Sequence, residues 1–267
     1  MIGDRLESFT SALQRVGIAA LALSVATLIA ASAGDAYAHE TEHPDLSGIW
    51  TWYRGGDSGP LGSGWPDDPP LTKEAEKKVA EYQTLVDPTG KTPGAFCLGT
   101  GMPGSMLGSG GYPMEIIQRP EQITIIYEAH TEIRRLYLKG PHTDVPEKDI
   151  FPTRLGYSTG HWEGDTLVVE TTHLKEQVDQ QAAHSNKAKI VSRYRLTRDE
   201  EDRKVLESEM TMTDPEFYTE PVTVTKRWQA VPDDEGRMLY YNCNEPAWEE
   251  YLEKLRAEAE ESQEAAN

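Results

Sequence analysis

The sequence predicts a mainly β protein, an antiparallel sandwich or barrel, and two observations carry this prediction. From Glu121 onward, short stretches of alternating apolar and polar residues recur, with Gly, Pro and Asp between them. No helical pattern separates these stretches, which excludes parallel strands joined by helices. The clearest stretch is 155–172 (LGYSTGHWEGDTLVVETT), which predicts a hairpin that turns at Glu163-Gly164-Asp165.

Counted from Ile49, the alternation predicts nine strands, most of them in a barrel core at 121–245. In the first strand, Trp50 and Trp52 share one face, and Ile49 and Thr51 share the other. The expected strands are 46–53, 122–128, 133–138, the two arms of 155–172, 188–197, 204–213, 222–231 and 238–243.

Two packing helices are expected, one on each side of this core in the sequence. The first lies in the lead-in region (39–120), with Thr72 as its N-cap and Asp87-Pro88 as its end. The second begins at Pro246, within 246–267, and should close one end of the barrel before an acidic tail. Their apolar stripes are Ala75, Val79, Tyr82 and Val86, and Trp248, Tyr251, Leu252 and Leu255.

The first 38 residues have the pattern of a secretory signal peptide. Arg5 and Arg15 supply positive charge, an apolar stretch follows at 16–33, and Ala36-Tyr37-Ala38 is a small-residue cleavage site. A membrane anchor is the competing interpretation, but alanine and serine make the stretch only weakly apolar. We therefore expect export to a bacterial periplasm or beyond, no membrane insertion of the mature chain, and one domain at 39–260.

The formal charge of −19 bears on the partners. So much negative charge repels nucleic acid and anionic lipid surfaces, and favours neutral or cationic ligands over phosphorylated ones. Most of these charges are also explained by solubility alone. The expected partner is a small molecule, with a homodimer left open.

Cys97 and Cys243 are the two cysteines of the chain. In an oxidising compartment they are expected to pair, which would tie a Gly-rich loop to the last predicted strand. The chain-entropy model gives such a bridge about 5 kcal/mol at most. Two buried free thiols are the alternative.

The Gly-rich loop at 91–113 contains Gly99-Thr-Gly-Met-Pro-Gly104, which matches the dinucleotide-binding fingerprint. That motif needs a strand before it and a helix after it, and Pro103 with further glycines makes this context improbable. We expect no nucleotide cofactor, and interpret the loop as a lid or rim beside the barrel.

A ligand pocket inside the barrel would be lined by apolar residues and a few polar ones. The alternation places Tyr127, Arg135, Glu170 and Tyr194 on the inward face. Arg134 shares a face with Leu136, so the choice between the two arginines is close. A surface or structural salt bridge is the alternative for each. Further candidate ligand contacts are His130, Tyr157 and Trp162.

Histidines are the natural acid–base candidates because they titrate near neutral pH. His184 is the first choice, since it precedes a strand beside an irregular loop, where a pocket mouth would lie. In this hypothesis His184 or Glu170 moves a proton and Arg135 pairs with developing negative charge. Tyr127 and Tyr194 orient the substrate. No spacing for a metal site and no G-x-S-x-G element is present, so neither a metal nor a cofactor is expected.

Several motifs together resemble a large group of exported bacterial proteins, mostly uncharacterised, found in proteobacteria and acidobacteria. The main motif is the hairpin Leu155–Glu170, of the form G-[YH]-S-x-G-x-W-E-G-D-T-L-V-V-[DE], where this chain has Tyr157, and has His161 where the group tends to carry Arg. The resemblance implies a lipocalin-like (calycin-type) barrel and carries no activity with it. The other landmarks are 44–50, 97–98, 101–103, 113–118, 134–138, 184–185 and 241–245.

Three functions remain in view. The leading hypothesis is an exported barrel that binds a small apolar or aromatic compound and converts it by cofactor-independent acid–base chemistry, as a lyase or isomerase. The second is a carrier or sensor without chemistry. The third is an interaction module that uses exposed strand edges with Trp50, Trp52 and Trp65.

Overall fold

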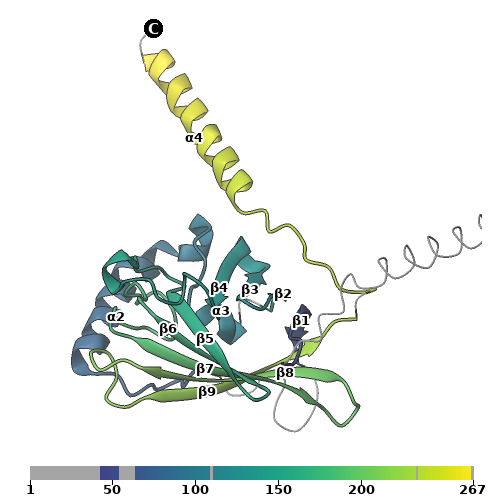
Figure 1. Cartoon of the computed structure of the whole chain (residues 1–267). Coiled ribbons are helices and arrows are strands. Elements are labelled where there is room, and N and C mark those ends of the chain that lie inside the picture. Colours follow the sequence, from purple (N-terminus) through teal and green to yellow (C-terminus); the bar gives the residue numbers. More distant parts are fainter. Residues whose placement is uncertain (1–42, 54–63, 109–110, 233, 266–267) are drawn as a thin grey trace, which may run out of the picture. The chain divides into compact units, whose positions relative to one another are not determined.

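The computed structural model describes residues 43–53, 64–108, 111–232 and 234–265, and side chains as far as residue 258. The predicted signal peptide and its cleavage site lie outside the described residues. The described chain contains a closed barrel whose nine strands follow one another in sequence order (Figure 1). They are β1 Gly48–Trp52, β2 Met114–Gln118, β3 Gln122–Tyr127, β4 Glu132–Tyr137, β5 Tyr157–Glu163, β6 Thr166–Thr172, β7 Lys189–Arg198, β8 Lys204–Thr213 and β9 Val222–Ala230.

The barrel closes because β1 pairs with both β2 and β9. Every neighbouring pair is antiparallel except β4 and β5, which run parallel through only two register positions, Leu136↔Ser158 and Tyr137↔Thr159. The antiparallel prediction is therefore right for most of the barrel and wrong at this seam. The chain between these two strands returns from one end of the barrel to the other.

Two strand predictions need correction, although the number of strands agrees. Strand β2 was missed, and it lies with β1 before the predicted core at 121–245. The segment 238–243 is not a strand. It has no edge to join, because β1 occupies the free edge of β9, and its residues Leu239 and Tyr240 are 55% and 75% exposed.

The predicted central hairpin is confirmed. Strands β5 and β6 pair from Tyr157↔Thr172 to Glu163↔Thr166, so Gly164 and Asp165 form a two-residue turn. Gly164 has φ +60°, a conformation that suits the right-handed twist of the flanking strands and that glycine adopts without strain.

Helix α2 (Lys73–Val86) has the predicted N-cap, since Thr72 Oγ1 accepts a hydrogen bond from the Ala75 amide at 3.2 Å. The other described helices are α3 (Gly104–Gly108), α4 (Asn244–Ala265) and short 3₁₀ turns at Asp87–Thr89, Pro93–Phe96, Ala129–Thr131 and Glu147–Asp149. None of the helices in the described part of the chain has the length and apolar character to cross a membrane.

The expected packing of the last helix is not found. In α4 the side chains of Trp248, Tyr251 and Leu255 are 58%, 49% and 39% exposed. The sequence of α4 therefore has the predicted apolar stripe, but these side chains do not pack against an end of the barrel.

Apolar side chains fill the barrel. Trp50 is fully buried, and its indole nitrogen donates to the Leu46 carbonyl at 3.0 Å. Alternate residues of the strands join it in one core, among them Ile116, Ile123, Ile125, Leu136, Leu167, Val169, Ile190, Leu206, Met210 and Val224.

The predicted disulfide between Cys97 and Cys243 is present, with a Cα–Cα distance of 5.6 Å. It joins the chain that precedes the Gly-rich segment to the chain that follows β9. Since the closed loop spans 146 residues, the bridge removes much of the conformational freedom of the unfolded chain.

Replacing both Cys97 and Cys243 by serine is expected to lower the free energy of unfolding by up to about 5 kcal/mol. Urea denaturation followed by tryptophan fluorescence measures the change, and the wild-type protein unfolded in reductant should show a similar loss. An unchanged midpoint in both experiments would contradict the expectation.

Candidate functional site

A buried arginine lies at the centre of the polar side chains inside the barrel. Arg134 on β4 is 2% exposed. Its Nη1 donates to Tyr194 Oη at 3.0 Å, and its Nη2 donates to Thr171 Oγ1 at 2.8 Å. Both Nε and Nη2 donate to Ser158 Oγ at 3.3 Å. These four residues, the interior arginine cluster, come from the adjacent strands β4 to β7.

The strand register decides which arginine of β4 faces inward. Arg134 and Leu136 are buried, whereas Ile133 is 41% exposed and Arg135 is exposed. The prediction that Arg135 faces inward is therefore wrong, and Arg134 takes that position. Its partner on β3 is Ile125, another buried residue, so the inward face is continuous across both strands.

The guanidinium of Arg134 contacts phenol and hydroxyl oxygens rather than a carboxylate. Burial opposes the charge, but the phenol oxygens of Tyr194 and Tyr127 offset this effect, and the pKa of the guanidinium is raised. Burial also raises the pKa of the Tyr127 phenol well above its ordinary value, so this hydroxyl is neutral near pH 7. Within the described chain, no carboxylate forms an ion pair with Arg134.

A second cation faces the interior from the opposite wall. Lys226 on β9 is 5% exposed and shares its face with the buried residues Val224 and Trp228. Burial lowers the pKa of its ammonium, and no hydrogen bond or ion pair joins Lys226 to another described residue. Across the sheet, Tyr194 is paired with Ser208, and Ser208 with Lys226. Lys226 thus lies two strands from the phenol that binds Arg134.

Two buried serines complete this set. Ser192 on β7 and Ser208 on β8 are both 0% exposed, and neither Oγ has a hydrogen-bond partner among the described residues. A buried hydroxyl without a partner costs about 1–3 kcal/mol. The interior therefore combines an apolar wall, two cations and several hydroxyls. Some of these polar groups could form hydrogen bonds to a ligand.

The Gly-rich segment at 99–108 enters the end of the barrel where β3 finishes and β4 begins. Met102 and Met106 are both 0% exposed and belong to the core, and Tyr127 Oη contacts Met106 Sδ at 2.7 Å. The segment predicted as a rim or lid is thus a plug, with its two methionines inside.

Polar contacts hold this plug in place. Glu132 accepts hydrogen bonds from the Gly101 amide at 3.0 Å and from Ser105 Oγ at 2.5 Å. Arg154 Nε donates to the Gly99 carbonyl at 2.8 Å. Gly101 has φ +74°, and a Cβ there would lie 2.5 Å from the Arg154 carbonyl oxygen, so only glycine fits.

The sequence fingerprint at 99–104 lacks the structural context of a dinucleotide site. A 3₁₀ turn (Pro93–Phe96) and irregular chain precede it, and α3, which follows, has only five residues. The glycines instead serve the close approach of the plug to the barrel.

His184 is fully buried and does not lie at a pocket mouth as predicted. Its side chain is 0% exposed, and neither ring nitrogen has a hydrogen-bond partner among the described residues. Its backbone pairs with Gln177 through hydrogen bonds of 2.9 and 2.8 Å. Burial is the largest effect on the imidazole and lowers its pKa to about 4, so it is neutral near pH 7.

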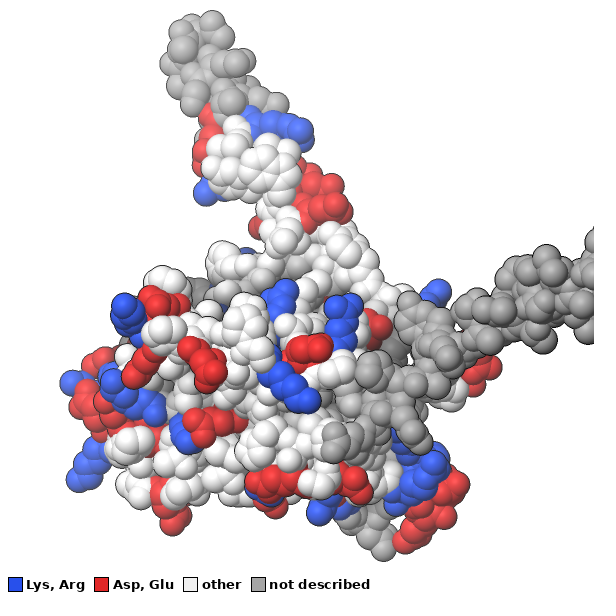
Figure 2. All heavy atoms as spheres, viewed as in Figure 1, with Lys and Arg blue, Asp and Glu red and all other residues white. Residues whose placement is uncertain are grey.

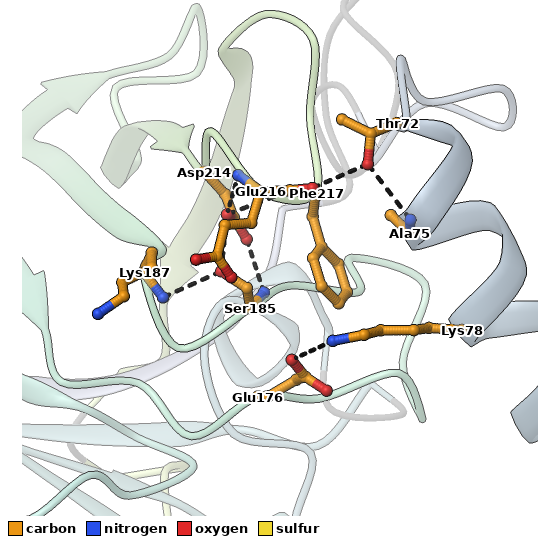
Figure 3. Close-up of polar contacts among 9 residues, drawn as sticks. All are labelled: Thr72, Ala75, Lys78, Glu176, Ser185, Lys187, Asp214, Glu216 and Phe217. Carbon is orange, nitrogen blue, oxygen red and sulfur yellow. Dashed lines mark hydrogen bonds and ion pairs between the residues drawn. The ribbon is translucent and has the colours of Figure 1, made fainter.

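The next residue, Ser185, is fixed by the buried carboxylate of Asp214 (Figure 3). Asp214 accepts from the Ser185 amide at 2.6 Å and from Ser185 Oγ at 2.8 Å. It also accepts from the amides of Glu216 and Phe217. Figure 3 shows that Thr72, at the start of α2, joins this turn through the Glu216 carbonyl at 2.8 Å. This network fixes the chain directly after His184.

The remaining catalytic candidate, Glu170, faces outward, contrary to the prediction. It is exposed and forms an ion pair with Lys189 on the neighbouring strand. On β6 the apolar residues 167–169 are all buried, so alternation there could not identify the inward face. His184, Glu170 and Arg135 are thus one buried and two exposed side chains, and the structure does not bring them together.

Of the predicted ligand contacts, Tyr127 and Tyr194 face inward and are 2% and 1% exposed. The other three lie elsewhere. His130 packs against Tyr241 at 4.8 Å in the turn between β3 and β4. Tyr157 donates to the His142 carbonyl, and Trp162 stacks on His43 at 4.8 Å.

Two cavities outside the barrel interior are also present. One, of about 440 Å³, lies between α2 and the chain at 178–183, and the other, of about 400 Å³, lies beside the β7–β8 turn. In the second, Arg203 pairs with Asp199 at 2.7 Å and Arg227 with Glu207 at 2.8 Å. Both of these arginines are therefore already paired with carboxylates, and neither cavity is lined by inward-facing strand residues.

Sequence reasoning missed the residues that make the interior polar. Arg134 was weighed and set second, while Lys226, Ser192, Ser208 and Met106 were not considered. A signal existed for Lys226, because Val222, Val224 and Trp228 place its position on the apolar face of β9.

Comparison with protein-family models finds no match, and comparison with curated proteins finds no similar protein. Within the described residues, no group of three or more His, Cys, Asp or Glu side chains could hold a metal ion. The barrel interior is therefore the candidate functional site.

The low pKa of His184 predicts a loss of stability in acid. The unfolded chain takes up the proton near pH 6.5, whereas the folded protein resists it down to about pH 4. The contribution of His184 to the free energy of unfolding is therefore fully present above pH 6.5. About 3 kcal/mol is lost as the pH falls from 6.5 to 4.

His184→Leu should remove this pH dependence. The free energy of unfolding of the variant should therefore rise relative to that of the wild type as pH falls from 7 to 4. Denaturant unfolding at several pH values measures it, with His161→Gln, at an exposed histidine, as the matched control. Parallel stability curves for wild type and His184→Leu would contradict the expectation.

Proposed function

We propose that this protein is an exported carrier or sensor that binds a small, largely apolar or aromatic molecule inside the barrel. The observation that carries the proposal is the interior itself, where Arg134 and Lys226 stand among buried hydroxyls in an apolar wall. Apolar walls with a few placed polar groups are typical of small-molecule sites.

Binding requires that the ligand replaces side chains that now fill the barrel. Met106 is the best candidate, because its flexible side chain comes from the plug and meets a phenol, Tyr127. The plug is held largely by hydrogen bonds to Glu132, Arg154 and Gln180. Water can replace hydrogen bonds of this kind when the plug moves.

Conversion of the ligand by acid–base chemistry, as a lyase or isomerase, is the second candidate. It would have to use the phenols beside Arg134, because the buried ring of His184 has no hydrogen-bond partner in the described part of the chain, and Glu170 and Arg135 face outward. The observation in its favour is the Arg134–Tyr194 contact of 3.0 Å. Recovery of the ligand unaltered after incubation separates the carrier from the enzyme.

A barrel filled with side chains is what the interaction module would have, but two other observations count against this function. The barrel is closed, so strand edges are not available, and Trp50 and Trp65 are 0% and 5% exposed. Export, a lipocalin-like identity of the barrel and membership of the exported bacterial group remain parts of our proposal. The Cys97–Cys243 disulfide supports an oxidising compartment.

The proposal predicts saturable binding of a neutral aromatic probe, N-phenyl-1-naphthylamine, with an increase in its fluorescence. Met106→Ala should tighten this binding several-fold because it makes room beside Tyr127, and should lower stability by about 2–5 kcal/mol. Leu85→Ala, at a side chain that is 75% exposed, is the control and should change neither.

Absence of saturable binding to the folded wild type and to folded Met106→Ala would refute the proposal. Unchanged affinity in Met106→Ala would show that a bound probe lies elsewhere.

A further inference from the structure

We infer that the ligand is a carboxylic acid with an apolar body, whose carboxylate is bound by Arg134 and Lys226 inside the barrel. The inference rests on the proposed function and names the chemical class of its ligand. The surface of the molecule and its interior differ in charge.

The chain as a whole carries a formal charge of −19. On the face shown in Figure 2, acidic and basic side chains are interspersed. Inside the barrel, two cations face the core, and neither has a carboxylate partner among the described residues. The expectation that net charge favours neutral or cationic ligands therefore does not extend to these two inward-facing cations.

Burying a cation without a counter-ion is unfavourable because the ion loses its hydration. For Arg134, a structural role explains part of this cost, since its four hydrogen bonds tie β4 to β5, β6 and β7. Neutral hydroxyls satisfy its donors but leave its charge without a counter-ion. A bound anion would supply that counter-ion.

Among the residues that the structure describes, Lys226, Ser192 and Ser208 do not join strands through side-chain hydrogen bonds as Arg134 does. Lys226 makes no described contact that would satisfy its ammonium, and the hydroxyls of Ser192 and Ser208 have no partners in the described chain. A carboxylate offers about four acceptor positions, enough for an ammonium, a guanidinium and neighbouring hydroxyls.

The register makes a shared anion geometrically reasonable. Lys226 is paired with Ser208, and Ser208 with Tyr194, which binds Arg134. Paired residues in a sheet have Cβ atoms about 5 Å apart, so Lys226 and Tyr194 are separated by about 10 Å along the wall. Arg134 Nη1 already reaches Tyr194 Oη at 3.0 Å, so an anion bound beside this phenol would be approached by the arginine from one side and by the lysine from the other.

The apolar body of the ligand would lie towards the plug. Met106 and Tyr127 meet there, and Met102 and Trp50 lie in the same core. An anion with two charges, such as a phosphate monoester, is repelled more strongly by the acidic chain than a carboxylate with one charge.

A matched pair of compounds tests the inference, namely 1-naphthylacetate and 1-naphthaleneethanol. They share an aromatic ring system and differ in the charged group. Charge-assisted hydrogen bonds are stronger than neutral ones, so the carboxylate should bind at least about tenfold more tightly to the wild type. Displacement of N-phenyl-1-naphthylamine measures both affinities.

Arg134→Met and Lys226→Met should each reduce this preference by several-fold, without loss of binding to the neutral probe. Arg135→Met and Lys175→Met, at exposed cations, are the matched controls and should keep the full preference. Circular dichroism checks the fold of each variant. If Arg134→Met does not fold, the wild-type comparison and Lys226→Met still decide the question.

Equal affinity of the wild type for the two compounds would overturn the inference but leave the proposed function standing. The inference would also be overturned if both Lys226→Met and a folded Arg134→Met still bound the carboxylate more tightly than the alcohol. Other residues would then bind the carboxylate. Failure of the neutral probe to bind at all would remove the proposed function and the inference together.

Discussion

The hydrogen bonds of one guanidinium hold the barrel together where its sheet is weakest. Strands β4 and β5 are joined through two register positions only, and they run parallel. Arg134 crosses this seam from the inside and reaches Ser158, Thr171 and Tyr194 on the next three strands. The hydrogen bonds of Arg134 therefore reinforce the barrel at the seam where few backbone pairs join the strands.

That constraint shapes what the interior can do. Because hydroxyls rather than carboxylates surround Arg134, its charge remains available, and Lys226 adds a second available charge on the other wall. The plug at 99–108 covers this region with methionines, which pack well but are also adaptable. The disulfide at Cys97 fixes the chain just before the plug, so movement of the plug would be confined to the segment itself.

Local signals in the sequence predicted the local structure well. The Thr72 cap, the turn at Gly164-Asp165 and most strand positions depend on neighbouring residues, and the structure confirms them. The sequence could not show that β1 would close on β9. Only that closure leaves 238–243 without an edge to pair with, so the missing strand was a consequence of the topology.

The candidate site was predicted less well, for a related reason. On β4, Ile133 and Leu136 lie on opposite faces, so alternation alone could not choose between Arg134 and Arg135, and on β6 the buried run 167–169 concealed the outward direction of Glu170. His184 was chosen for its position beside a loop. The Asp214 network, which buries its neighbour Ser185, brings together residues distant in sequence.

The central claim is that Arg134 is a charged, buried group whose charge is free to receive an anion. Nitrogen-15 NMR of the arginine side chains tests it most directly, with Arg134→Met used to assign the signal. We predict a Nε–H resonance for Arg134 that exchanges slowly with water and shifts on addition of 1-naphthylacetate. A resonance that exchanges as fast as that of the exposed Arg135, or that does not respond to saturating carboxylate, would contradict the account.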